Sequence, residues 1–213
     1  MAIAPRRYSD SKIADASFLS QRHPCLHDAV YNASPQVLME VDAGMQSYFA
    51  ELLDACRGEV AGEAFFTALA QQMAEPEHAR KWRTLARLEQ FVANRLRAVL
   101  EAEGVRIPAT EPDWQRGLRS AKEYAALSWR EALDRLLPEL DRYVREFEAS
   151  ESRMPKNLLP LAQFVTAHER ALVEFVTLEL AHQGADSLAA ALRLLEENPL
   201  APVERPLPKK STM

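Results

Sequence analysis

The stretch at residues 49–92, FAELLDACRGEVAGEAFFTALAQQMAEPEHARKWRTLARLEQFV, decides the fold, because two runs of apolar residues in it flank a single break. In each run the apolar residues recur at spacings of three and four, which is typical of a helix that buries one face. The break lies at Glu75-Pro76, since proline is tolerated in the first turn of a helix but not in its interior. The sequence therefore predicts a hairpin of two long helices, over about residues 36–74 and 77–103.

The rest of the chain divides at three further breaks, which are residues 104–112, residues 150–155 and Gly184. These breaks predict helices over about 113–149 and 157–183 and a short fifth helix over 188–197. Long helices joined by short connections usually pack antiparallel. The predicted fold class is therefore all-α, an antiparallel four-helix bundle with an extra short C-terminal helix.

Both ends of the chain lack helical spacing. Residues 1–34 mix polar residues with proline and predict an irregular N-terminal arm, whereas the proline-rich residues 199–213 predict an irregular tail. The helical bundle domain is expected between them, at 35–198.

Composition narrows the classes of function. Of 213 residues, 47% are hydrophobic and 27% are charged, which is the composition of a globular protein, and the formal net charge of −5 argues against a nucleic-acid partner. Charged residues interrupt the longest apolar stretch, and the N-terminus carries no secretory signal, so we expect no membrane partner and a cytoplasmic location. A small-molecule substrate is expected, and a homodimer is left open.

Carboxylates interrupt the apolar faces of the predicted hairpin. Glu59 and Glu63 lie on the apolar face of its first helix, and Glu89 lies on that of its second helix. A buried carboxylate is expensive unless it is protonated, paired with a base or bound to a cation. With the turn centred near residue 76, Glu63 and Glu89 are equidistant from it, so we expect them to lie side by side and to share a proton or a metal ion.

The fourth predicted helix offers a further acid and a histidine as candidate ligands. Glu179 and His182 are three residues apart, which places both on one helix face, where they can bind the same metal ion. Their height relative to Glu89 depends on the third helix, which Pro138 is expected to kink or split. A straight third helix brings this pair level with Glu89, whereas a break at Pro138 brings His168 and the following glutamate there instead.

These patterns resemble the ferritin-like superfamily of di-iron carboxylate four-helix bundles over roughly residues 44–183. The resemblance is carried by GEAFF at 62–66, LARLE at 85–89 and ELAH at 179–182. In that superfamily, one helix of each pair supplies a lone Glu and the other supplies Glu-x-x-His. The resemblance implies that the ligands are Glu63 on the first helix, Glu89 on the second, and Glu179 with His182 on the fourth.

Two ligands of the superfamily have no match in this chain. Val92 stands where the second helix would supply His, and the apolar face of the third helix carries no acid. His168, Glu169 and Glu59 are the candidates to replace the missing ligands.

Three functions are consistent with this pattern. The first is an iron- or manganese-binding oxidoreductase that acts on a small molecule, with Glu63, Glu89, His168, Glu179 and His182 as the candidate metal ligands. The second is a metal-free helical bundle that binds a partner protein, in which the acids pair with arginines. The third is a helical ligand-binding or oxygenase-like protein that uses His168 in its pocket.

Overall fold

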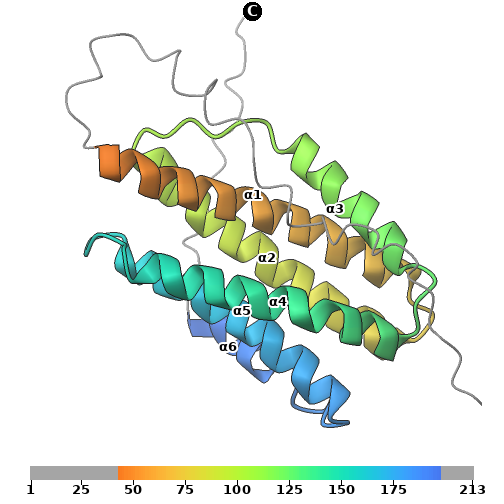
Figure 1. Ribbon diagram of the computed structural model, residues 1–213. Helices are drawn as coiled ribbons and strands as arrows, with labels where there is room; N and C mark the ends of the chain where they lie inside the picture. The colour runs from red at the N-terminus through yellow and green to blue at the C-terminus, as the bar shows by residue number, and fades with distance from the viewer. Residues whose placement is uncertain (1–42, 198–213) are drawn as a thin grey trace, which may run out of the picture.

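The computed structural model describes residues 43–197, which form six α-helices and contain no strand (Figure 1). The helices are α1 (Ala43–Gln72), α2 (Pro76–Ala102), α3 (Glu111–Tyr124), α4 (Trp129–Glu151), α5 (Leu159–Leu180) and α6 (Ala189–Glu197). The prediction of an all-α fold is confirmed. The arm predicted at 1–34 and the tail predicted at 199–213 lie outside the described residues. Within the described part, no helix combines the length and apolar character needed to cross a membrane.

The helices α1 and α2 form the predicted hairpin and lie side by side (Figure 1). Glu75 is the N-cap of α2, and its side chain accepts a hydrogen bond from the backbone N–H of Glu77. Pro76 occupies the first turn, where a missing backbone donor is harmless. Only residues 73–75 connect the two helices, so their register is tightly set.

The single helix predicted over 113–149 is wrong, because this part of the chain forms two helices, α3 and α4. The break lies at Ser128, which starts α4 with a capping box. The hydroxyl of Ser128 accepts a hydrogen bond from the backbone N–H of Glu131, and the Glu131 carboxylate accepts one from the backbone N–H of Ser128. This reciprocal pair satisfies backbone donors at a helix start, so the chain begins a new helix here.

The predicted split at Pro138 does not occur, since Pro138 lies inside α4. Both Pro138 and Asp134, the residue one turn before it, are exposed. The backbone carbonyl that loses its hydrogen bond therefore lies on the solvent side, where water can satisfy it.

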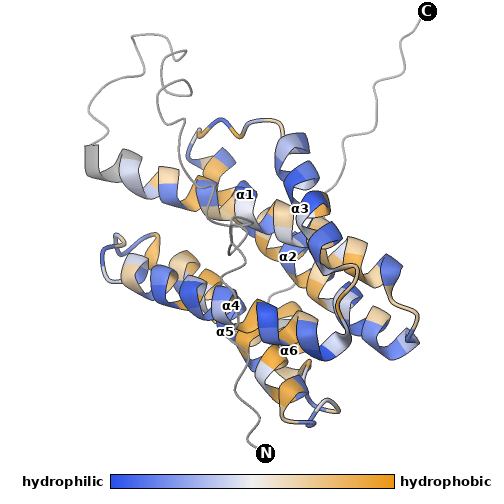
Figure 2. Cartoon of the chain, turned by 45° about the vertical axis from the view of Figure 1, so that its right-hand side comes forward, coloured by the Kyte–Doolittle hydropathy of each residue, from blue (hydrophilic) through white to orange (hydrophobic). Residues whose placement is uncertain are grey.

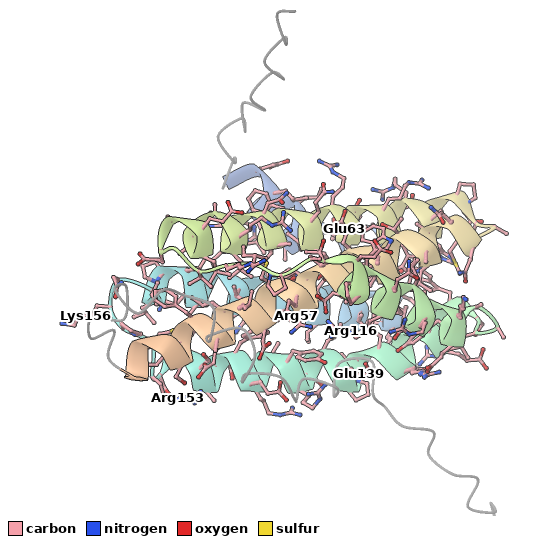
Figure 3. The ribbon with its side chains drawn as sticks, turned by 90° about the horizontal axis from the view of Figure 1, so that it is seen from above. Arg57, Glu63, Arg116, Glu139, Arg153 and Lys156 are labelled. Carbon is pink, nitrogen blue, oxygen red and sulfur yellow. The ribbon has the colours of Figure 1, made fainter. Side chains whose placement is uncertain are left out.

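The short helix α3 packs along α1 (Figure 3), and a buried ion pair and a close approach of the two helices hold it there. Asp113 is buried. It accepts a hydrogen bond of 3.1 Å from Arg57 of α1 and forms an ion pair of 3.3 Å with Arg116. Gly117 lies against the backbone of Ala61, and a Cβ on it would come within 2.7 Å of the Cβ of Ala64. Only glycine allows this spacing.

The helices α4 and α5 form a second hairpin, and α6 packs on α5 and α2 (Figure 1). Phe175 of α5 and Trp129 of α4 both contact Trp82 of α2, with ring centroids 5.8 and 4.8 Å away. Hydrophobic residues on the helices turn toward one another, and hydrophilic residues cover much of the outside (Figure 2). The aromatic contacts therefore join the two hairpins through a shared apolar interior.

We expect Gly117→Val to lower the free energy of unfolding by roughly 2–3 kcal/mol, because the new side chain must push α3 away from the backbone of α1. Urea denaturation followed by circular dichroism measures this loss. The matched control is Gln115→Val, which places the same side chain on an exposed face of α3. Equal losses in the two variants would show that helix propensity, and not the close approach, is responsible.

Candidate metal centre

Three buried side chains from three helices meet inside the protein. They are Glu59 on α1, Glu89 on α2 and His168 on α5, with exposed fractions of 3%, 4% and 0%. One potential ligand atom from each lies within 4.8 Å of the others. Nδ1 of His168 is 3.6 Å from Oε2 of Glu59, and Nε2 of His168 is 3.4 Å from Oε1 of Glu89. The imidazole ring thus lies between two carboxyl groups.

The length of the α1–α2 connection brings Glu59 and Glu89 together. Residues 73–75 are centred on residue 74, and Glu59 and Glu89 are equidistant from that centre along the two antiparallel helices. The carboxyl groups of the two residues share a hydrogen bond.

Gly62 makes room for the carboxyl group of Glu89. It lies three residues after Glu59, and a Cβ at this position would come within 2.6 Å of Cδ of Glu89. Any larger residue would therefore occupy the space of the buried carboxyl group. The sequence places this glycine inside a long helix, where it is otherwise unfavourable relative to alanine.

Burial raises the pKa of Glu89 to about 8, and the negative charges of Glu169 and Glu63 raise it further, against the opposing effect of the hydrogen bond with Glu59. At neutral pH, Glu89 is therefore mostly protonated and can share its proton with Glu59. Proton sharing is one way to keep two adjacent carboxyl groups in an apolar interior. A divalent cation is another.

A small cavity of about 30 Å³ adjoins the cluster. Among the residues that line it are Glu59, Glu89, Glu169 and Tyr143, and no lysine or arginine of the described part of the chain is among them. The volume exceeds what one water molecule needs, so a water or a metal ion has room there. Phe65, Phe66, Leu136, Leu140 and Leu172 form much of the remaining wall.

Of the five residues predicted as metal ligands, the structure brings Glu89 and His168 together. Glu63 lies one turn beyond Glu59, is partly exposed, and accepts a hydrogen bond of 2.7 Å from the side chain of Gln90. The predicted turn centre at residue 76 was two residues too late. Moving the centre to 74 shifts the partner of Glu89 by four residues, which is one helical turn.

Glu179 and His182 lie away from the cluster. The Glu179 carboxylate accepts hydrogen bonds from Lys81 at 2.5 Å, Trp129 at 3.2 Å and Ser187 at 2.5 Å, so it is already neutralised and satisfied. His182 follows the end of α5, is exposed, and has a positive φ of 60°. It belongs to the turn that ends the helix and does not share a helix face with Glu179.

From the sequence, Glu59 and Glu169 are predicted only as replacements for missing ligands. Two signals favour Glu59 in retrospect: its position on the apolar face of α1, and a glycine three residues later that can accommodate a facing side chain. His168 and Glu169 reach the site because α4 is short, as expected for a broken third helix. The break, however, lies at Ser128 and not at Pro138.

The arrangement suits two kinds of chemistry. Two carboxyl groups and an imidazole are the ligand types that iron and manganese use in proteins. Without a metal, the same groups can hold and exchange a proton, because Glu89 titrates near neutral pH.

We expect the chelator-treated protein to lose stability as the pH rises from about 5 to 8. Folding raises the pKa of Glu89 from 4.5 to about 8, so its protonation stabilises the folded state below pH 4.5, and this contribution is lost as the pH rises through 8. The loss is on the order of 4 kcal/mol. Urea denaturation at several pH values measures it, and Glu89→Gln should flatten the profile.

The control for this profile is Glu174→Gln, which alters an exposed carboxylate on α5. It should follow the wild-type profile. A wild-type profile that already matches that of Glu89→Gln would show that Glu89 is ionised in the folded protein at neutral pH.

No family model, curated protein sequence or solved structure matches this chain. Of the residues that carry the resemblance to the ferritin-like superfamily, Glu89 lies in the cluster, whereas Glu63, Glu179 and His182 do not. What the protein does must be inferred from the geometry around Glu59, Glu89 and His168.

Proposed function

We propose that this protein is a ferritin-like, metal-binding oxidoreductase that acts on a small molecule, with iron or manganese held by Glu59, Glu89 and His168. The observation that carries the proposal is the meeting of these three buried side chains, each with a ligand atom within 4.8 Å of the others. The two hairpins, α1 with α2 and α4 with α5, would be the two helix pairs of the four-helix bundle, and α3 would be an addition that packs on α1.

The hydrogen bonding of His168 supports the proposal that the site binds a metal ion. Within the described part of the chain, neither of its ring nitrogens makes a hydrogen bond, although both are buried. A buried polar atom that makes no hydrogen bond is expensive, by about 1–3 kcal/mol. If one nitrogen binds a metal ion, the other N–H remains available to a facing carboxylate, which is the usual arrangement for metal-bound histidines.

The charges of the site also favour a cation. Glu59, Glu89 and Glu169 all line the same small cavity, so full ionisation of these carboxyl groups would concentrate negative charge in an apolar interior. A divalent ion would displace the proton of Glu89 and balance the charges. Mixed imidazole and carboxylate ligands suit iron and manganese, whereas calcium and magnesium prefer oxygen ligands alone.

When bound, iron or manganese would supply a redox-active Lewis acid. The protein's own contribution is to hold the three ligands from three helices and to exclude bulk water with the apolar wall of the cavity. Glu169 lines the cavity and can accept or donate a proton beside the ligands. Tyr143 closes the α4 side of the same cavity.

We expect the untagged, chelator-treated protein to bind about one Mn²⁺ or Fe²⁺ per chain, as measured by anaerobic titration and by elemental analysis after gel filtration. Glu59→Gln, Glu89→Gln and His168→Gln should each weaken binding by about 100-fold or more, since even residues that only support ligands contribute 10–100-fold. A metal concentration 100 times the dissociation constant should stabilise the wild type by about 2.7 kcal/mol.

Matched controls come from the residues that the structure places away from the cluster. Glu174→Gln changes an exposed acid on α5, and His182→Gln changes an exposed histidine. Both should bind metal as the wild type does. A folded wild type that ignores both ions and keeps its melting temperature would refute the proposal and favour a metal-free bundle with a shared proton.

A further inference from the structure

A second and larger cavity lies beside the metal centre, between α1, α4 and α5. Its volume of about 170 Å³ equals that of five or six water molecules in the liquid. A single organic molecule with about six non-hydrogen atoms would fill it.

This cavity lies one helical turn from the metal centre on each of the three helices. On each of these helices, one residue lines the larger cavity, and a residue four positions away lines the small cavity around the cluster. The pairs are Ala55 and Glu59 on α1, Phe147 and Tyr143 on α4, and Val165 and Glu169 on α5. One turn advances a helix by 5.4 Å, so the two cavities follow one another along the same three helices.

The floor of this cavity is apolar and its rim is acidic. Leu52, Ala55 and Val165 are buried and line the floor. The charged lining residues are Glu51, Asp54, Glu146 and Arg153, so three carboxylates face one guanidinium. Such a rim attracts cations and disfavours anions.

Of the three rim carboxylates, Asp54 has the weakest interactions with neighbouring side chains. Glu51 accepts a hydrogen bond of 2.6 Å from Ser150, and Glu146 accepts one of 2.7 Å from Arg142. Asp54, by contrast, has an ion pair of 3.9 Å with Arg57, whose Nε donates to Asp113 at 3.1 Å. An incoming ammonium group can therefore pair with Asp54 without breaking a short bond.

We infer that this cavity binds a small aliphatic primary amine, with its ammonium group at the acidic rim near Asp54 and its alkyl chain on the apolar floor. That the amine is the substrate of the metal centre rests on the proposed function. Binding of the amine does not, because none of the three metal ligands lines this cavity.

The test compares three probes of nearly equal size by NMR titration of the full chain. Pentylamine is a cation at pH 7, because alkyl ammonium groups have pKa values above 10. Pentan-1-ol is neutral, and butanoate is an anion. Pentylamine should bind at millimolar concentration or better and at least about tenfold more tightly than butanoate, with pentanol between them. Equal binding of all three, or no binding of the amine, would overturn the inference.

Two variants locate the binding. Asp54→Asn should weaken pentylamine binding about fivefold and leave pentanol binding unchanged. Its control is Glu148→Gln, which removes an exposed carboxylate of α4 that pairs with Arg170 outside this cavity. Ala162→Phe should fill the cavity and abolish binding of both probes, and Ala162→Met is the milder version if the phenylalanine variant does not fold. A loss in Glu148→Gln equal to that in Asp54→Asn would show that the amine senses only the overall charge.

Metal titrations distinguish failure of this inference from failure of the proposed function. Ala162→Met should bind Mn²⁺ as the wild type does, and Glu89→Gln should bind pentylamine as the wild type does. Amine binding without metal binding would support the cavity assignment alone, and metal binding without amine binding would refute it. Displacement of pentylamine by Mn²⁺ from Glu89→Gln would also overturn the inference, because the rim would then be a site for any cation.

Discussion

The constraint on which this structure depends is the presence of two carboxyl groups in the apolar interior between α1 and α2. Glu59 and Glu89 are both buried, and their proximity is tolerable when a proton, a basic partner or a cation offsets their charge. The three-residue connection at 73–75 sets their register, and Gly62 leaves the space that the Glu89 carboxyl group fills. Both features are therefore part of the site.

Two other acids with buried carboxylates are neutralised by basic side chains. Asp113 pairs with two arginines where α3 docks on α1, and Glu179 pairs with Lys81 where α5 ends. The Glu59–Glu89 pair has a histidine beside it in place of a lysine or arginine. This difference in partners separates an ion pair that holds helices together from a cluster that can take up a cation.

Local features of the sequence were enough to predict much of the fold. Spacings of three and four, Pro76 and Gly184 indicated the helices and most of their ends, because periodicity and capping act within one or two turns. The break at Ser128 was not predicted, because a Ser and a Glu three residues later are common in helices as well as at their starts, whereas Pro138 is a stronger helix-breaking signal. Of the candidate site, Glu89 and His168 were found, but Glu63 was preferred to Glu59 because a two-residue error in a turn centre becomes a full turn in the partner helix. The hydrogen bond from Lys81 to Glu179 joins residues 98 positions apart, and no local sequence pattern predicts it.

The space at Gly62 links two distant positions in the evolution of this chain. While an acid stays at position 89, even alanine at position 62 would displace the carboxyl group of Glu89 from its place in the site, since a single methyl group would come within 2.6 Å of the carboxyl carbon. Once a short side chain replaces Glu89, alanine should be favoured at position 62, because a helix interior favours alanine over glycine. Homologous chains should therefore vary at these two positions together, and that paired variation would tell descendants that keep the site from those that have lost it.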